Sequence, residues 1–147
     1  MVKNILLCVL GTFGFCAVLN APKKHIKYIL LGAFISAGAY ELCERRLLLG
    51  VFSSTLISAV AVELYSEVVA RAIKAPAIVI LVPSEIPLLP GGYLFYAVTS
   101  VVSGKLDLFF HYASLTACVA FALAMGAVIC LIVLSVLRRG KERFTDG

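Results

Sequence analysis

The sequence predicts an all-α integral membrane protein of about five transmembrane helices, the fourth broken by a Pro/Gly-rich segment. Of its 147 residues, 62% are hydrophobic and 14% are charged, whereas a soluble globular domain is nearer half apolar and a quarter charged. The apolar residues form long runs, and the basic residues cluster between them as the positive-inside rule describes. One run contains three prolines and a Gly-Gly pair, and proline interrupts a helix because it lacks an N–H group.

Five apolar runs approach the length of about 20 residues that a helix needs to cross the hydrocarbon core of a bilayer. They cover residues 4–19, 26–43, 47–70, 77–104 and 108–137, and a basic tail follows at residues 138–147. The first run is similar to a signal peptide, but Ala17-Val18-Leu19-Asn20-Ala21 lacks small residues at the paired cleavage positions, so we expect a retained span. We expect a single membrane domain in contact with the lipid bilayer.

The basic residues predict the orientation of these spans. Five spans place the larger group on one side of the membrane, namely Lys23, Lys24, Lys27, Arg71, Lys74, Arg138, Arg139, Lys141 and Arg143. The smaller group falls on the other side and consists of Lys3, Arg45, Arg46 and Lys105. The positive-inside rule then predicts a multi-pass protein of the cell membrane with its N-terminus outside and its C-terminus in the cytoplasm. A re-entrant fourth segment would leave four spans and divide the charges less cleanly.

Other classes of function find little support in the composition. The net charge of +5 comes from the loop clusters and does not indicate a nucleic-acid partner. The five cysteines lack metal-ligand spacing, and we interpret them as small apolar packing residues: Cys8, Cys16, Cys43, Cys118 and Cys130. His25 and His111 are far apart, and no nucleophile, phosphate-loop or zinc motif accompanies them. We therefore expect no enzymatic activity, no metal and no cofactor.

The break itself is Pro83-Ser84-Glu85-Ile86-Pro87-Leu88-Leu89-Pro90-Gly91-Gly92. We expect its prolines to end the entering half-helix, its Gly-Gly pair to make a sharp turn, and a second half-helix to run from about Tyr93 through Ser100. The first N–H groups of that half-helix have no intrahelical partner and lie at the positive end of its dipole, where a carboxylate binds well. Lipid cannot satisfy the freed backbone groups, and broken helices near the bilayer midplane indicate a transporter binding site. The alternative is a kinked helix with only a packing role.

Three glutamates lie inside the predicted spans. Glu63, Glu67 and Arg71 are spaced to share one helix face, and pairing with Arg71 is the default explanation for Glu67. Glu63 lies about 12 Å from Arg71 along the helix axis, and an ionisable group at that depth is usually functional. We hypothesise that Glu63 titrates or binds a cation or amine during transport; alternatively, it pairs with a base of another subunit or faces cytoplasmic water. Glu85 can recognise a substrate amine or carry a coupled proton, but if ionised it would repel a substrate carboxylate.

Small residues are spaced for close helix packing. Gly32, Ser36 and Tyr40 follow one helical row, with Ala33 and Ala37 beside it. Two further pairs with the same spacing are Ala120 with Ala124 and Ala122 with Gly126. Small residues let helix backbones approach where no hydrophobic force acts between them. They serve either packing within one subunit or a subunit interface, and we expect an oligomer.

Two stretches are similar to elements of a known family. Gly14-Phe15-Cys16-Ala17-Val18-Leu19-Asn20-Ala21-Pro22 resembles the GF…FN.P element that ends the first span of the threonine/serine exporter family. A second element of that family has the pattern P…P..IP..PG…Y. The stretches of this chain that resemble it are Lys74-Ala75-Pro76-Ala77, Val82-Pro83, Ile86-Pro87-Leu88-Leu89-Pro90-Gly91 and Tyr96. The order and separation also match, so the resemblance covers most of the chain. The match is to the short, C-terminal half of that family.

The resemblance implies a function that the residues alone do not. In some members this half is fused behind a larger half, and in others it is a separate small subunit that works with a large one. The chain then resembles the small subunit of a secondary transporter that exports small carboxylate-bearing metabolites, either threonine and serine or dicarboxylates such as succinate. A larger membrane subunit of the same family is the implied partner. Glu85 departs from the family, where that position is more often small or apolar, and this leaves the substrate open.

We expect the substrate carboxylate to rest at the start of the second half-helix and Asn20 to shape the cytoplasmic end of the first span. The expected substrate site comprises Pro83, Ser84, Glu85, Pro87, Pro90, Gly91, Gly92, Tyr96 and Asn20. The expected coupling-ion residues are Glu63 and Glu67. Two competing hypotheses are a non-transporting subunit that only scaffolds or regulates a partner, and a passive channel without ion coupling.

Overall fold

The computed structural model describes residues 2–145, with the side chains of residues 3–136, and every regular element in this part of the chain is a helix. The elements are α1 (Val2–Val18), η1 (Lys23–His25), α2 (Ile26–Arg45), α3 (Val51–Ile73), α4 (Ile78–Ser84), η2 (Ile86–Leu88), α5 (Gly91–Val102) and α6 (Leu106–Thr145). The predicted basic tail continues α6 as far as residue 145. Its side chains and residues 146–147 lie outside the described part.

Three of the helices end in the same hydrogen-bonded turn, which fixes their boundaries. After α1, the N–H of Asn20 bonds to the Ala17 carbonyl at 3.3 Å and that of Ala21 bonds to the Cys16 carbonyl at 2.9 Å. This pair of bonds is the Schellman motif, which requires a left-handed residue at its centre. The central residue is left-handed in each case: Asn20 (φ 50°) after α1, Lys74 (φ 52°) after α3 and Gly104 (φ 70°) after α5.

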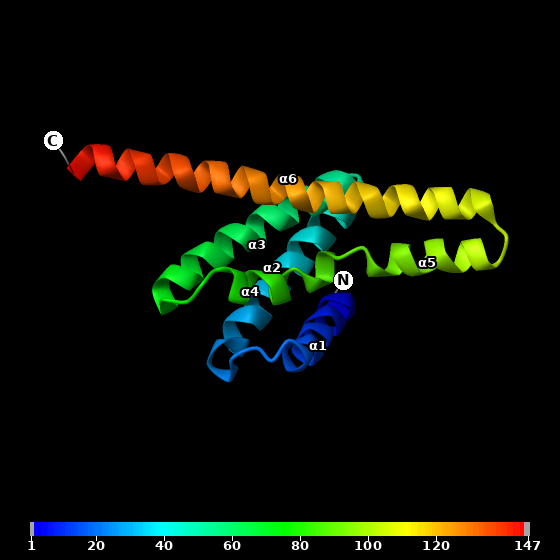
Figure 1. Cartoon of the computed structure of the whole chain (residues 1–147), viewed down its shortest axis with the longest axis horizontal. Helices are drawn as coiled ribbons and strands as arrows, with labels where there is room; N and C mark the ends of the chain where they lie inside the picture. Colours follow the sequence, from blue (N-terminus) through cyan, green and yellow to red (C-terminus); the bar gives the residue numbers. More distant parts are fainter. Residues whose placement is uncertain (1, 146–147) are drawn as a thin grey trace.

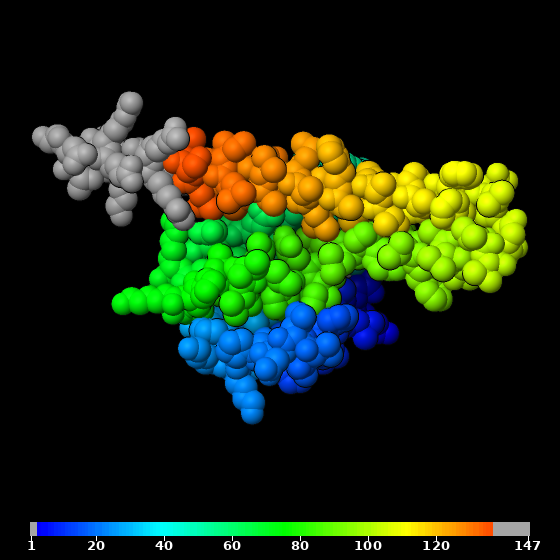
Figure 2. Space-filling view, in the orientation of Figure 1, coloured from blue at the N-terminus to red at the C-terminus, as the bar shows by residue number. Residues whose placement is uncertain are grey.

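The long α6 runs the length of the molecule along one side, and α3 and α5 pack against it (Figure 1). α3 lies parallel to the second half of α6. The Phe52 and Phe121 rings stack with centroids 6.3 Å apart, and Ala59 packs against Gly126 nearer the C-terminal ends of the two helices. α5 lies antiparallel to the first half of α6, where the Tyr96 and Tyr112 rings are 5.4 Å apart. α2 packs on α3 and α4, and α1 packs on α2. The α5–α6 hairpin projects from the remaining helices (Figure 2).

Small residues make the closest contacts between helices. On α2, Gly32, Ala33, Ser36 and Ala37 are buried, and a β-carbon at Gly32 would overlap Ser84 of α4. On α6, Ala122 and Gly126 are buried, and a β-carbon at Gly126 would lie 2.8 Å from that of Ala59. These residues therefore pack helices within one chain. Ala120 and Ala124 are exposed, so a role at a subunit interface remains a prediction for that pair.

The surface of the molecule is unusually apolar. Large hydrophobic side chains are more than half exposed along several helices, for example Leu10 (66%), Phe95 (66%) and Leu131 (66%). The interior, in contrast, is rich in hydroxyls, and several bond to the carbonyl one turn back: Thr12, Thr55, Ser58 and Ser84. Apolar side chains on the outside and hydroxyls between closely packed helices are features of proteins that fold in lipid.

Two helical stretches are long and apolar enough to cross a membrane, residues 23–45 and residues 106–136. The pair formed by residues 78–88 and Gly91–Val102 passes the same test when taken together, although its axis bends by 51°. α1, with 17 residues, is a shorter apolar helix. Within the described residues, the structure thus confirms an all-α chain with two or three candidate spans, and the count of five remains a prediction.

Candidate functional site

The predicted break lies between α4 and α5. Pro83 sits inside the last turn of α4, and the single turn of η2 is closed by a bond from the Leu88 N–H to the Glu85 carbonyl at 2.8 Å. Leu89 is extended (ψ 137°), because the residue before a proline is pushed out of the helical region. Pro90 then caps α5, whose first bond runs from the Leu94 N–H to the Pro90 carbonyl at 2.9 Å.

The Gly-Gly pair does not form the turn that we predicted from the sequence. Gly91 and Gly92 are already helical, and α5 begins two residues earlier than expected. The change of direction occurs at Leu89 and Pro90 instead, because the proline restricts both its own φ and the residue before it. The glycines therefore supply the first exposed turn of α5, and a β-carbon at either of them would meet no atom within 4 Å.

Ser84 anchors the end of α4 against α2. Its side chain is fully buried, and its hydroxyl lies 2.7 Å from the Ile80 carbonyl and 3.1 Å from that of Ile29. In return, the Ser36 hydroxyl donates to the Ser84 carbonyl at 2.8 Å. The close approach at Gly32 makes this exchange possible. The Ser84 carbonyl, which follows Pro83 in the break, is thus satisfied by a protein group rather than by lipid.

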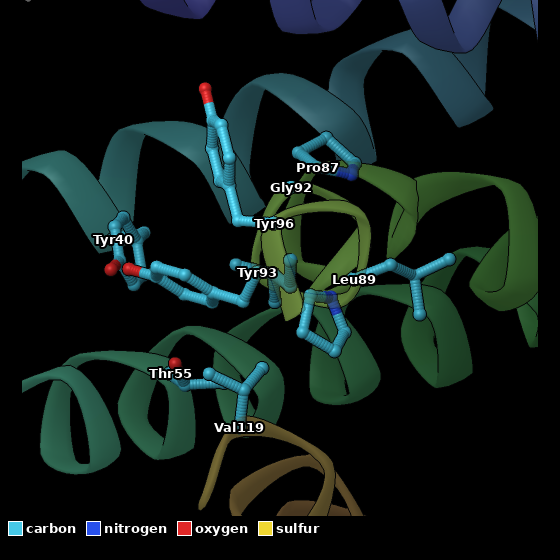
Figure 3. Close-up of a pocket in the computed structure, with 10 residues that line it drawn as sticks. Tyr40, Thr55, Pro87, Leu89, Gly92, Tyr93, Tyr96 and Val119 are labelled. Carbon is cyan, nitrogen blue, oxygen red and sulfur yellow. The ribbon is translucent and has the colours of Figure 1, made fainter. Parts of the chain in front are cut away.

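A cavity of about 230 Å³ lies beside the break (Figure 3). It is bounded by α2, α3, α5, α6 and the η2 segment, through Tyr40, Thr55, Pro87, Leu88, Leu89, Pro90, Gly92, Tyr93, Tyr96 and Val119. The hydroxyls of Tyr40 and Tyr93 face each other in it, while the Tyr96 hydroxyl points away from them. The cavity combines apolar walls with a few polar groups, which is typical of small-molecule sites.

The structure distributes the nine predicted substrate-site residues over five places. Four line the cavity: Pro87, Pro90, Gly92 and Tyr96. Gly91 precedes Gly92 on the exposed turn, and Ser84 lies in the interface between α2 and α4. Glu85 is half-buried, close enough to Glu63 for their charges to interact. Pro83 and Asn20 line a different cavity.

This second cavity, of about 320 Å³, joins the two sequence elements that resemble the exporter family. It lies between the loop after α1 and α4, and includes Asn20, Pro22, Val82 and Pro83. Asn20 also has a structural role, because its left-handed backbone ends α1. Asparagine tolerates that conformation better than most residues.

The carboxylates of α3 have different surroundings. Glu63 is 5% exposed and lies in the middle of α3, about 15 Å from its last residue at 1.5 Å per residue. It lines a small cavity of about 160 Å³ with Leu81 and Cys130, and the Cys130 thiol is within hydrogen-bonding reach of its carboxylate. Glu67 pairs with Arg71 at 3.2 Å, as its spacing predicts.

Sequence reasoning missed Tyr40 and Thr55 as cavity residues. Tyr40 ends the row that begins at Gly32, and this row packs α2 against α4, so its last member reaches the break. No feature of the sequence around Thr55 indicates that it lines a cavity. Its hydroxyl donates to the Val51 carbonyl of the same helix at 2.8 Å. Among the described residues, no group of three or more His, Cys, Asp or Glu side chains is arranged to hold a metal ion.

Comparison with known proteins agrees with the two sequence elements. A family model described as "Threonine/Serine exporter, ThrE" matches residues 4–133, a stretch that contains both elements and the whole break. No curated protein and no solved structure matches the chain. The apolar surface and the family together indicate a membrane protein. From a match over most of its length, we conclude that the chain belongs to the threonine/serine exporter family, a family of transporters.

Proposed function

We propose that the chain is the small subunit of a secondary transporter that exports small carboxylate-bearing metabolites and works with a larger membrane subunit. The observation that carries the proposal is the cavity at the break, where helix α5 begins next to tyrosine hydroxyls. Members of its family are transporters, and a broken helix that lines a cavity is a common way to build a transport site.

The substrate carboxylate binds at the first turn of α5 in this proposal. The N–H groups of Gly91, Gly92 and Tyr93 precede the first intrahelical bond of α5, and they lie at the positive end of its dipole. The absence of a side chain at Gly92 leaves this backbone open to the cavity. The Tyr93 hydroxyl, which faces that of Tyr40 in the cavity, supplies a further donor.

We propose that Glu63 and Glu67 couple transport to an ion. Glu63 supports this role best, since it is buried at the middle of α3 and close enough to Glu85 of the break for their charges to interact. Protonation or cation binding at Glu63 would change its repulsion of Glu85, and so bias the position of the segment that lines the site. Glu67 lies one turn nearer the end of α3 and is partly neutralised by Arg71.

The proposed topology keeps five spans, with the N-terminus outside the cell membrane and the C-terminus in the cytoplasm. α2 runs antiparallel to α3, since the Tyr65 hydroxyl donates to the Tyr28 carbonyl near the start of α2 at 2.9 Å. The basic residues that open α2 and those that close α3 therefore lie at the same end of the molecule. This arrangement supports a cytoplasmic end at Lys23, Lys24, Lys27, Arg71 and Lys74.

A second subunit would complete the site. Tyr96 lines the cavity but is 54% exposed, and its neighbour Phe95 is 66% exposed. Both belong to the hairpin that projects from the other helices (Figure 2). A larger partner of the same family, packed along this hairpin, would close the open side of the cavity, and the two subunits form the proposed oligomer.

Efflux from preloaded cells tests the proposal. The chain is expressed alone and together with its large-subunit candidate, and efflux of labelled threonine, serine and succinate is followed with and without a proton gradient. Efflux that needs both chains and the gradient supports a coupled two-subunit exporter. Efflux that follows the solute's own gradient and does not depend on any ion gradient would indicate a channel instead. No efflux of any of the three solutes, with both chains verified in the membrane, would favour the scaffold hypothesis.

A further inference from the structure

The second cavity, between the loop after α1 and helix α4, is an apolar groove on the outside of the molecule. Ile78 is 65% exposed and Val82 is 47% exposed, so the groove is open along α4. Asn20 supplies the only polar side chain of its lining, and the other lining residues are Leu19, Ala21, Pro22, Ile78, Val79, Val82 and Pro83. Such a lining suits an apolar chain better than a polar solute, because a polar group costs free energy where it finds no hydrogen-bond partner.

One end of this groove has a rim of lysines. Lys23 and Lys24 begin η1 after the loop, and Lys74 caps the end of α3 just before α4 begins. The two places meet in space, because Ala21 and Ala77 pack on one cluster of buried side chains. All three lysines are exposed. The groove thus combines an apolar length along α4 with a basic rim at the start of that helix.

The chain does not balance the charge of this rim. No Asp or Glu occurs between residues 5 and 40 or between residues 68 and 84. Glu67, just before the second of these ranges, pairs with Arg71 at 3.2 Å. Among the described side chains, none forms an ion pair with the three lysines of the rim. The rim therefore attracts an anion that comes from outside this part of the chain.

We propose that the groove binds an anionic phospholipid of the cytoplasmic leaflet, with the lipid phosphate at the lysine rim and the first part of one acyl chain along α4. The leaflet follows from the topology proposed above, in which the same lysines face the cytoplasm and anionic lipids attract them. From Ile78 to Pro83 the groove extends about 8 Å at 1.5 Å per residue, so the acyl chain reaches the break itself. The site does not depend on which solute the chain exports.

Thermal unfolding of the full chain in mild detergent tests the site, since a ligand that binds only the folded state raises the unfolding temperature. The probes are phosphatidylglycerol and phosphatidylcholine with identical acyl chains, and glycerol phosphate, which has none. We expect phosphatidylglycerol alone to raise the unfolding temperature. Lys23→Gln/Lys24→Gln/Lys74→Gln should need about a hundredfold more of it for the same rise, at about fivefold for each lysine. Val82→Phe fills the groove while keeping the lysines, and should lose most of the rise.

Two controls match these variants. Lys3→Gln/Arg46→Gln/Lys105→Gln removes the same charge from exposed residues outside the groove. Val68→Phe adds the same bulk at a position of α3 that is 68% exposed. Both should respond to phosphatidylglycerol as the wild type does. If Val82→Phe does not fold, the lysine variant and its charge control still decide the outcome.

Four results would overturn the lipid site. An equal response to both phospholipids would mean that the rim does not select an anionic headgroup, and an equal loss in the charge control would mean a general effect of charge. A rise with glycerol phosphate would indicate a site for free anions, as would a full response of Val82→Phe. A response that disappears when the large-subunit candidate is bound would make that subunit, rather than a lipid, the occupant of the groove.

Discussion

Gly32 is the position at which the break is held most tightly, and its replacement by alanine tests how the broken segment is fixed to α2. An added β-carbon would overlap both Oγ and Cβ of Ser84 and lie 3.2 Å from the Tyr65 ring. Ser84 has no room to withdraw, because it is fully buried and its hydroxyl is bonded to carbonyls on two helices. The substitution therefore has to separate α2 from α4 or displace the Ser84 side chain.

The magnitude follows from three contributions. Overpacking of a close contact costs about 1–3 kcal/mol, and loss of the Ser84 hydroxyl bond to the Ile29 carbonyl costs about 1 kcal/mol more. Alanine gains about 1 kcal/mol over glycine in helix propensity. The net destabilisation of Gly32→Ala is then about 1–3 kcal/mol. Gly38→Ala, on the same helix with nothing within 4 Å of the added atom, should be neutral or stabilising by up to about 1 kcal/mol.

Thermal unfolding in detergent, followed by loss of helical circular dichroism, measures the difference between the two variants. We expect Gly32→Ala to unfold several degrees below the wild type and Gly38→Ala to unfold at or above it. The double variant Gly32→Ala/Ser84→Gly removes the overlapping atoms, so it should be more stable than the sum of the single effects. Equal unfolding temperatures for the two alanine variants would refute the proposed contact between α2 and the break.

Three further predictions concern the site. Asn20→Gly should keep the fold, because glycine accepts φ 50° readily, whereas Asn20→Ala should lower the unfolding temperature. If Asn20→Gly exports threonine as well as the wild type does, the role of Asn20 is structural only. Gly92→Leu fills the open turn beside the cavity and should reduce efflux of every substrate at least tenfold, with unchanged membrane abundance; normal efflux would count against a site at the start of α5. Glu63→Gln should make efflux insensitive to the proton gradient, as measured with and without an uncoupler, and transport like wild type at every pH would remove Glu63 from coupling. The matched control for this last variant is Glu44→Gln, which removes the same charge at a half-buried residue outside the proposed coupling pair.

The sequence by itself determined the features that depend on a residue and its immediate neighbours. The break is one of these, because a proline lacks an N–H group and restricts the residue before it wherever it stands. The predicted ion pair between Glu67 and Arg71 is another, since helical spacing alone brings the two side chains together. The membrane character and the family also followed from the chain itself, through its apolar runs and the two elements around Asn20 and Pro83.

Only the tertiary structure decided which side chains face one another. Ser84 belongs to the same short segment as Pro87, but contact with Gly32 draws it into a helix interface while Pro87 faces two cavities. Tyr40 of α2 reaches the break although it precedes Pro83 by more than forty residues in the chain. The packing of α3 against α4 brings Glu63 close to Glu85. Such pairings depend on how whole helices approach and rotate, and no local pattern of residues records that.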